Sequence, residues 1–444
     1  MLYSLLKILS RVTVFSYFKN LEITGKENLT QKEPVIVVAN HPSTFMDPII
    51  LAVILRFKLF FIAAAEYMGK GFQKMFFQRF FHMIPVYRPS TKPEDSHKNK
   101  NMFDYCYKHL GSGKSLLIFP EGVSVTSDHL HPLKTGVARI AIGAEKASSN
   151  ELDLKILSVG LNYSNPHKFR SNLLINVSEP ISVKSVINKH DEETDQIRAL
   201  MVEIREKLEG SVLHIEEIEN SEFIKQVSEL LRHFKSTSPH NEEDNFLILK
   251  RLNSFLNEFI DKEEEKTIAF KEKTKEFYRF MNREGISLKA EALHKKINTF
   301  KTWFIAIFGA PLFLIGLLTN WIPYKLVGVL NNKLKLSETF FGAVSLAAGM
   351  LIFTFWYLIM ALVLGFTLIS FWALFIPFVA YSFGIYALLY SNLIGKLMEV
   401  NGSTRKLKGE SRVKAEYDTR LKDLFERLLY FQEKILTSNS RSQF

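Results

Sequence analysis

The longest uncharged stretch of the chain runs from Thr339 to Gly395 and contains no Asp, Glu, Lys, Arg or His. It is more than twice the roughly 20 residues that an α-helix needs to cross a bilayer. Gly365 falls near its middle, where a turn between two helices is expected. We therefore predict a transmembrane helical hairpin at residues 336–395, with one helix on each side of this glycine.

The run before this hairpin, Trp303–Tyr324, is also apolar but is interrupted by Gly309, Pro311 and Gly316. Basic residues flank it on both sides and also follow the hairpin, whereas the expected hairpin turn has none. Cytoplasmic flanks of membrane segments are enriched in Lys and Arg. We predict that residues 301–335 form a kinked re-entrant or interfacial segment, with three full crossings as the alternative.

Both ends of the chain have an amphipathic pattern. In residues 1–20, apolar side chains recur near helical spacing with Lys7 and Arg11 on another face, and no small-residue cleavage site follows. This pattern predicts an interfacial amphipathic helix, with a first transmembrane helix as the alternative. Residues 396–444 alternate charged residues with leucines, which predicts an amphipathic C-terminal helix packed on the rest of the protein.

Residues 21–190 alternate short apolar runs with helical segments. The runs lie at 34–39, 58–63, 115–119, 155–159 and 173–177, and the first of them is rich in β-branched residues. Continuous runs of this kind are typical of buried strands in a sheet that is covered on both faces. The predicted fold class is α/β, with a mixed, largely parallel sheet flanked by helices. Residues 191–300 are polar with a helical period and predict a helical arm.

The net charge of +11 suits an anionic membrane surface or an anionic substrate. Nucleic acid would fit the same charge, so charge alone does not select the partner, and we expect no nucleic acid. The single cysteine, Cys106, excludes an intrachain disulfide and a four-cysteine zinc site, and a buried, inert thiol is expected. His129 and His131 lack a supporting carboxylate or cysteine pattern, so no metal is expected.

The strongest local feature is the sequence Asn40-His-Pro-Ser-Thr-Phe-Met-Asp-Pro48, directly after a predicted strand. A histidine at a strand end lies where α/β sheets place their sites. Imidazole takes a proton from an attacking alcohol near neutral pH, and a carboxylate orients the ring. His41 and Asp47 are therefore the candidate base and its orienting acid. The alternative is a turn in which Asn40 and Asp47 cap local backbone and His41 is incidental.

Three further motifs follow in order: Ile84–Arg88, Phe119–Gly122 and Pro132–Ala138. Together with the motif around His41, this order resembles the glycerolipid acyltransferase superfamily, which includes plant and bacterial glycerol-3-phosphate and lysophosphatidate acyltransferases. The resemblance covers about residues 30–185. It implies a membrane-bound enzyme that moves a fatty acyl group from a thioester onto a glycerophosphate hydroxyl.

The resemblance implies a role for each matched residue. His41 matches the base that deprotonates the acceptor hydroxyl, and Asp47 matches its orienting acid. Arg88 matches the basic residue that grips the acceptor's phosphate, which a guanidinium binds through two hydrogen bonds. Glu121 and Gly122 match the motif that shapes the acceptor site.

Further positions are assigned beside these motifs. Ser124 and Lys134 are taken as substrate-binding residues, although a lone lysine such as Lys134 is also typical of plain surface. Val159-Gly-Leu161 stands where the superfamily has an apolar motif near the acyl donor, with Ser158 in place of the usual proline.

Two departures from the superfamily pattern bear on the acceptor. Five residues separate His41 from Asp47 rather than the usual four, and Val123-Ser124 stands where Thr-Arg is common. Both features look like the fungal branch that acylates glycerol 3-phosphate and dihydroxyacetone phosphate. The expected acceptor is glycerol 3-phosphate or 1-acylglycerol 3-phosphate. The sequence does not decide whether the Asp47 carboxylate reaches His41 across the longer spacing.

The expected donor is a thioester of coenzyme A or of acyl carrier protein, with membrane lipid as a partner and no cofactor. Two alternatives remain: a transferase of the same fold that acts on another lysolipid or an amine-headed lipid, and a non-catalytic membrane-anchored protein whose arm binds a partner. The expected location is a bacterial inner membrane with a cytoplasmic catalytic domain, or an internal eukaryotic membrane.

Overall fold

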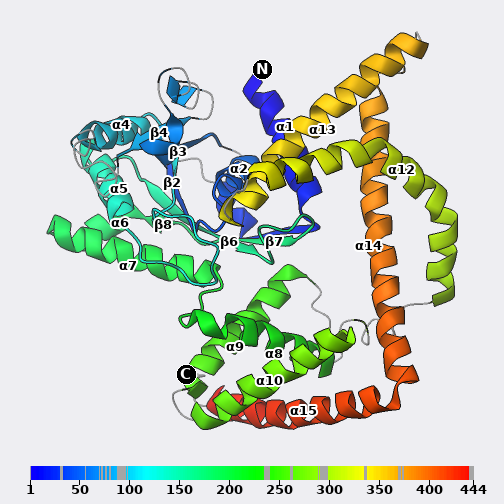
Figure 1. The fold of residues 1–444 in the computed structure, drawn as a ribbon. Coiled ribbons are helices and arrows are strands. Elements are labelled where there is room, and N and C mark those ends of the chain that lie inside the picture. The colour runs from blue at the N-terminus through cyan, green and yellow to red at the C-terminus, as the bar shows by residue number, and fades with distance from the viewer. Residues whose placement is uncertain are drawn as a thin grey trace. The chain divides into compact units, whose positions relative to one another are not determined.

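The computed structural model forms two compact units, residues 1–216 with 327–351 and residues 217–326 with 352–444 (Figure 1). We call the first the α/β unit and the second the helical unit. The structure describes residues 2–439 except 31–33, 56, 70, 72–73, 76–77, 80–81, 88–96, 98, 235–240, 261–263, 289, 291–298, 335–337, 369–371 and 373–374.

The α/β unit is built on one sheet, which has eight strands among the described residues. The strand order is β1-β7-β6-β2-β5-β3-β4, with β8 beside β6. Neighbours pair in parallel except β6 with β7 and with β8. This arrangement confirms the predicted mixed, largely parallel sheet. The strands are β1 (Asn20–Thr24), β2 (Val35–Ala39), β3 (Leu59–Ala64), β4 (Met83–Val86), β5 (Ser115–Ile118), β6 (Lys155–Tyr163), β7 (Asn172–Val177) and β8 (Ile181–Ser182).

One face of the sheet is covered by helices that lie close to its strands in sequence, and we call this face the α4–α7 face (Figure 1). Ile36 and Val38 of the central strand β2 point into this face, where they join apolar residues of the helices. Every residue of β2 is buried, as expected for a strand with helices on both sides. The helices are α4 (Asn99–Gly111), α5 (Gly136–Ala147), α6 (Val183–Ile187) and α7 (Glu193–Ser211).

The opposite face is covered by α1 (Leu2–Tyr17), α2 (Met46–Ile54) and the start of α13 (Glu338–Leu368), and we call it the α1–α2–α13 face. Val35 and Val37 of β2 point this way, because side chains alternate along a strand. Ala343 and Leu346 of α13 are each 1% exposed within the same core. A helix from the apolar C-terminal region thus completes the α/β unit.

The predicted boundary at residue 191 differs from the structure. Helix α7 belongs to the α/β unit, which continues to residue 216. Leu200, Ile204 and Leu208 are fully buried in the core of the α4–α7 face. The polar, helical pattern of this segment is that of an amphipathic helix with one buried stripe, which periodicity alone does not separate from a solvated arm.

The helical unit contains the remainder of the predicted arm, from residue 217, and the C-terminal helix. Rings from different helices contact one another, with centroids 5.3 Å apart for Phe223 and Phe270 and 4.9 Å apart for Phe270 and Phe431. The elements are α8 (Ser221–Phe234), α9 (Glu242–Ile260), α10 (Glu264–Glu284) and α15 (Ser411–Asn439). The chain also contains short 3₁₀ turns at Lys26–Thr30, Ala65–Met68 and Ile218–Asn220.

Three helices are long and apolar enough to cross a membrane, judged by length and composition over the described residues. They are α12 (Thr299–Leu334), α13 and α14 (Ile376–Gly409). The predicted hairpin turn at Gly365 is wrong, because α13 continues through this glycine to Leu368. A single glycine costs a helix only about 1 kcal/mol relative to alanine, so it does not by itself end one.

Gly309 and Gly316 do not interrupt α12, contrary to the prediction from the sequence, but lie where α14 approaches it closely. The helix is continuous through Pro311, and an added Cβ at Gly316 would lie 2.2 Å from the carbonyl oxygen of Phe383 in α14. These small residues allow two apolar helices to approach closely, as is common between membrane helices. The re-entrant path predicted for residues 301–335 and the interfacial position of α1 stay predictions.

Candidate active site

The site is built where β2 and β5 end, at the carboxyl edge of the parallel strands. Strand β2 ends at Ala39, and the loop that follows carries His41 before α2 begins at Met46. Asp47 lies in the first turn of α2. Parallel α/β sheets place binding sites at this edge, because loops from several strands converge there.

His41 and Asp47 form a hydrogen-bonded pair. Nδ1 of His41 lies 2.8 Å from Oδ2 of Asp47, whose side chain is fully buried. The imidazole is 18% exposed and stacks on Phe119, with ring centroids 3.9 Å apart. A carboxylate at Nδ1 favours the tautomer with the proton on that nitrogen, which leaves the lone pair on Nε2. This arrangement leaves Nε2 as the ring nitrogen that is able to accept a proton.

Two more donors hold the Asp47 carboxylate. The Ser43 N–H donates to Oδ2 at 2.8 Å, and the Tyr163 hydroxyl donates to Oδ1 at 2.6 Å. Hydrogen bonds to both oxygens fix the rotation of the carboxylate about its axis. The sequence singled out neither Ser43 nor Tyr163.

The five-residue spacing between His41 and Asp47 is accommodated by a turn. The Met46 N–H donates to the carbonyl oxygen of Ser43 at 2.9 Å, and Thr44 between them has a φ of 38°. This left-handed conformation is uncommon for a threonine and costs of the order of 1 kcal/mol or more. The extra residue is thus taken up in the turn, and the carboxylate still reaches the imidazole.

Ser124 makes two contacts with the loop at residues 40–45, which we call the catalytic loop after its candidate base His41. Its Oγ accepts from the Thr44 N–H at 2.9 Å and donates to the carbonyl oxygen of His41 at 2.9 Å. Thr126 donates to the carbonyl oxygen of Pro42 at 2.8 Å. The departure from Thr-Arg therefore matches the longer loop, since a guanidinium has no acceptor for the Thr44 N–H. In this structure Ser124 supports the loop; a contact with substrate stays a prediction.

Glu121 joins the same loop to the segment before α5. One oxygen accepts from the His41 N–H at 3.0 Å, and the other accepts from the His131 N–H at 3.1 Å. Burial raises the pKa of Glu121, and the two N–H donors partly offset this effect. Both carboxylate oxygens are thus engaged in positioning backbone beside the imidazole.

Lys134 lies against Gly122. The glycine has a φ of 67°, and an added Cβ would lie 2.6 Å from Nζ of Lys134. The Lys134 N–H donates to the carbonyl oxygen of Pro120 at 2.8 Å, while its side chain is exposed. The structure thus brings Glu121, Gly122 and Lys134 together at the end of β5. Arg88, the predicted phosphate-binding residue, lies outside the described residues.

Asn40 connects the catalytic loop to β6. Its side chain accepts from the Leu161 N–H at 2.7 Å and donates to the Leu161 carbonyl oxygen at 3.0 Å. Val159-Gly-Leu161, predicted to lie near the acyl donor, is thereby tied to the residue before His41. An added Cβ at Gly160 would lie 2.1 Å from the carbonyl oxygen of Ser211. This glycine therefore permits the close approach of the end of α7.

The start of α13 contacts the catalytic loop from the other side. Thr44 Oγ1 donates to the carbonyl oxygen of Thr339 at 3.3 Å, and the rings of Phe45 and Phe340 lie 6.0 Å apart. An added Cβ at Gly342 would lie 2.1 Å from the carbonyl oxygen of Pro166 and 3.3 Å from the Met46 side chain. The residues between His41 and Asp47 thus contact both the start of α13 and Ser124.

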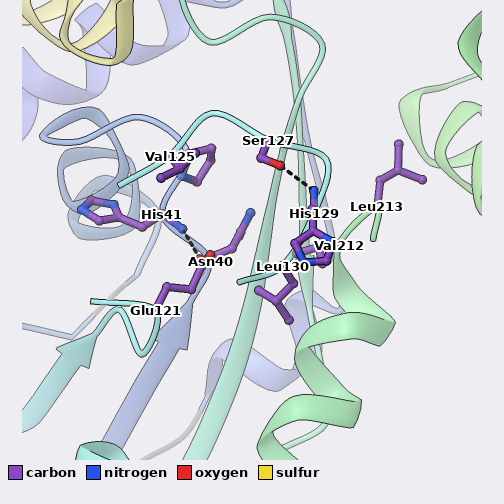
Figure 2. A pocket seen from close by; sticks show the side chains of 10 residues that line it. Asn40, His41, Glu121, Val125, Ser127, His129, Leu130, Val212 and Leu213 are labelled. Atoms are coloured by element: carbon purple, nitrogen blue, oxygen red, sulfur yellow. Dashed lines mark hydrogen bonds between the residues drawn. The ribbon is translucent and has the colours of Figure 1, made fainter. Parts of the chain in front are cut away.

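Two cavities of the described structure are lined by residues of the α/β unit. The first, of about 10 Å³, has space for about one water and is lined by His41, Glu121 and His129 among others (Figure 2). Figure 2 shows the His41 ring directed away from His129. The second, of about 510 Å³, runs along β4 and α4 and includes Tyr87, the residue before Arg88. Only the second has the volume of a ligand site.

Among the described residues, no cluster of three or more His, Cys, Asp or Glu side chains could hold a metal ion. Cys106 is fully buried in α4, and burial raises its pKa to about 12. The prediction of a buried thiol is confirmed.

Residues 20–162 match a family model described as acyltransferase. The chain is 36% identical over 108 residues to glycerol-3-phosphate O-acyltransferase 1 of Saccharomyces cerevisiae. This aligned segment covers 23% of this chain and 14% of the yeast protein. The chain is also 36% identical over 85 residues to glycerol-3-phosphate O-acyltransferase 2 of the same yeast, covering 19% and 11%. These matches support the glycerolipid acyltransferase superfamily for residues 20–162.

An uncharacterized acyltransferase of Schizosaccharomyces pombe is also 36% identical, over 77 residues that cover 17% of this chain and 11% of that protein. A solved structure of the 1-acyl-sn-glycerophosphate acyltransferase of Thermotoga maritima matches with a TM-score of 0.34 and 16% identity, covering 47% of this chain and 79% of that one. The matched segment therefore spans about one seventh or less of the curated acyltransferases. The family model includes every predicted site residue and ends one residue before Tyr163.

Proposed function

We propose that this acyltransferase moves a fatty acyl group from an acyl thioester to a hydroxyl of glycerol 3-phosphate or 1-acylglycerol 3-phosphate. The observation that carries the proposal is the hydrogen-bonded pair of His41 and a fully buried Asp47 at the carboxyl edge of the sheet. Its position within the family-model match and the yeast relatives, which are named for glycerol 3-phosphate, support the choice of reaction and acceptor.

The residues of the pair divide the proton transfer between them. Nε2 of His41 takes the proton of the acceptor hydroxyl as its oxygen attacks the thioester carbonyl carbon. Asp47 holds the ring and stabilises the imidazolium that results. When the tetrahedral intermediate collapses, the carbon–sulfur bond breaks and the imidazolium returns its proton to the leaving thiolate. The products are an ester and a free thiol, and no covalent enzyme intermediate or cofactor is required.

The acceptor's phosphate needs cationic partners. Lys134 is exposed beside Gly122, in the loop whose Glu121 side chain accepts from the His41 backbone. A phosphate held there by Lys134 would present its glycerol hydroxyl toward His41, and this positioning lowers the entropic barrier to attack. Arg88 is proposed as a second cationic partner of this phosphate. Three helices that are long and apolar enough to cross a membrane support a reaction at a membrane, because the acyl donor's chain and the product are both lipids. We propose an internal or inner membrane with the α/β unit in the cytoplasm.

The proposal is tested first with His41→Ala in the full chain, purified in detergent. Acyl transfer from labelled acyl-CoA to glycerol 3-phosphate should fall by about a thousandfold or more, because removal of a catalytic base costs factors of this size. His190→Ala, in the loop before α7, serves as the matched control and should retain activity. Equal activity in His41→Ala and wild type would favour a non-catalytic, membrane-anchored interaction protein.

The acceptor is then identified by competition. Glycerol 3-phosphate, dihydroxyacetone phosphate, 1-acylglycerol 3-phosphate and a phosphate-free lysolipid are offered together, and the acylated products are quantified by mass spectrometry. Arg88→Ala and Lys134→Ala should raise KM for the phosphate-bearing acceptors only. Preferred use of a lysolipid with an amine headgroup would instead assign the chain to the second alternative.

A further inference from the structure

Tyr163 lies at the end of β6 and contacts the buried acid of the site. Its hydroxyl donates to Oδ1 of Asp47 at 2.6 Å, a length typical of an O–H group bonded to a carboxylate. The residue follows the family-model match directly and belongs to none of the motifs that the sequence analysis used. The contact joins residues 116 positions apart in the chain.

The sheet fixes the position of this hydroxyl. Tyr163 is paired with Leu173 of β7 across the antiparallel part of the sheet, and the preceding residues of β6 pair in parallel with β2. Its ring lies 5.9 Å from that of Phe18, a fully buried residue of the α1–α2–α13 face. A side chain anchored in a central strand has little freedom, so its hydroxyl provides a fixed reference for Asp47.

The two oxygens of Asp47 have different donors. Oδ2 faces His41 Nδ1 and the Ser43 N–H, which both belong to the same loop and move with it. Oδ1 receives the Tyr163 hydroxyl, which comes from the sheet. Without that donor, Oδ1 would remain buried with one hydrogen-bond partner fewer, which is costly for a polar oxygen away from water.

The tyrosine stays a donor over the working range of the enzyme. Burial, followed by the adjacent Asp47 carboxylate, raises the pKa of Tyr163 well above its ordinary value. The hydroxyl therefore remains protonated at neutral and mildly alkaline pH.

We propose that Tyr163 is a positioning residue of the acyl-transfer reaction: it holds Asp47 against the sheet so that Oδ2 faces His41 in spite of the longer loop between them. The inference rests on the function proposed above. It assigns Tyr163 no contact with substrate, and the residue acts only through Asp47.

The test compares Tyr163→Phe with Tyr17→Phe in the full chain. Tyr17 is a suitable control because it is 4% exposed in the same core and its hydroxyl has no hydrogen-bond partner in the described structure. Tyr163→Phe should lower kcat about tenfold or more with little change in KM for acceptor and donor, whereas Tyr17→Phe should match wild type. Circular dichroism melts check that both variants fold. Wild-type kcat in Tyr163→Phe would overturn the proposal.

A double-mutant cycle separates positioning from a general structural role. In an Asp47→Asn background, Tyr163→Phe should cause little further loss, because the carboxylate through which it acts is already absent. Losses that multiply would show that the tyrosine acts independently of Asp47, and the proposal would fail.

A readout without turnover distinguishes this inference from the proposed function. Modification of His41 by diethyl pyrocarbonate, followed by peptide mass spectrometry, should be at least about twofold faster in Tyr163→Phe than in Tyr17→Phe, because the ring is held less firmly. If the wild-type chain acylates no acceptor, the proposed function fails. The rate of His41 modification would still test whether Tyr163 positions the pair of His41 and Asp47. An unchanged rate would contradict the positioning role itself.

Discussion

The two faces of the sheet are buried to a similar degree but are assembled in different ways. The α4–α7 face is covered by helices from residues 99–211, which lie close to the strands in sequence. The α1–α2–α13 face is covered by the first helix, by α2 and by a helix that begins at Glu338. Met46, the residue before Asp47, belongs to this second face. Packing on one face therefore supports the fold, whereas packing on the other also shapes the catalytic loop.

The largest effect on this comparison is expected from Gly342→Ala. The added methyl group would overlap the carbonyl oxygen of Pro166 and press on Met46, which begins the helix of Asp47. Overpacking of this kind costs about 1–3 kcal/mol, and we expect acyl transfer to fall at least about tenfold because the catalytic loop shifts. Activity and melting temperature are measured on the purified chain.

The matched control for this change is Gly349→Ala in the same helix. An added Cβ there would meet no heavy atom within 4 Å. It should leave activity unchanged and stabilise the helix by up to about 1 kcal/mol. If the two alanine variants behave alike, α13 does not bear on the catalytic loop, and the functional distinction between the two faces is wrong.

A pair of leucine truncations sharpens the comparison. Leu110 in the α4–α7 face and Leu346 in the α1–α2–α13 face are 0% and 1% exposed. Each change to alanine should cost about 2–5 kcal/mol of unfolding free energy, measured by thermal or denaturant unfolding. At a temperature where both variants are folded, only Leu346→Ala should lower kcat, by several-fold. A similar loss of kcat in Leu110→Ala would remove the distinction.

The smallest effect is expected at Cys106, which lies in the α4–α7 face. Its pKa is raised to about 12 by burial, so the reactive thiolate is scarce up to pH 9. The native chain should therefore react with N-ethylmaleimide far more slowly than the unfolded chain, and prolonged treatment at pH 8 should leave acyl transfer intact. Rapid loss of activity on alkylation would show that this face also bears on the site.

Local patterns predicted the parts of the site that are continuous in sequence. The apolar runs located most of the strands, and the motif around His41 indicated a base with a carboxylate at a strand end. The same reasoning left open whether five intervening residues allow contact, because the answer depends on a left-handed Thr44 supported by Ser124. Such a contact between separate loops has no signature in the spacing.

Other features depend on contacts between distant segments. Tyr163 is one aromatic residue in an apolar strand, and nothing local separates a ring that fills a core from one whose hydroxyl meets a carboxylate. Gly365 suggested a turn, yet α13 passes through it. Hydropathy also did not indicate that the start of α13 packs on protein. Burial against a sheet and burial in lipid favour the same apolar residues.

The contribution of residues 327–351 to the α/β unit has a consequence for proteolysis. After a cut within residues 217–326, the start of α13, which packs in the same core as Val35, Val37 and Met46, would belong to a separate peptide. If that peptide dissociated, apolar side chains beside the acid would be exposed to water, and the shed N-terminal fragment would aggregate rather than act as a free enzyme. Detachment from the lipid bilayer by cleavage would thus inactivate the protein.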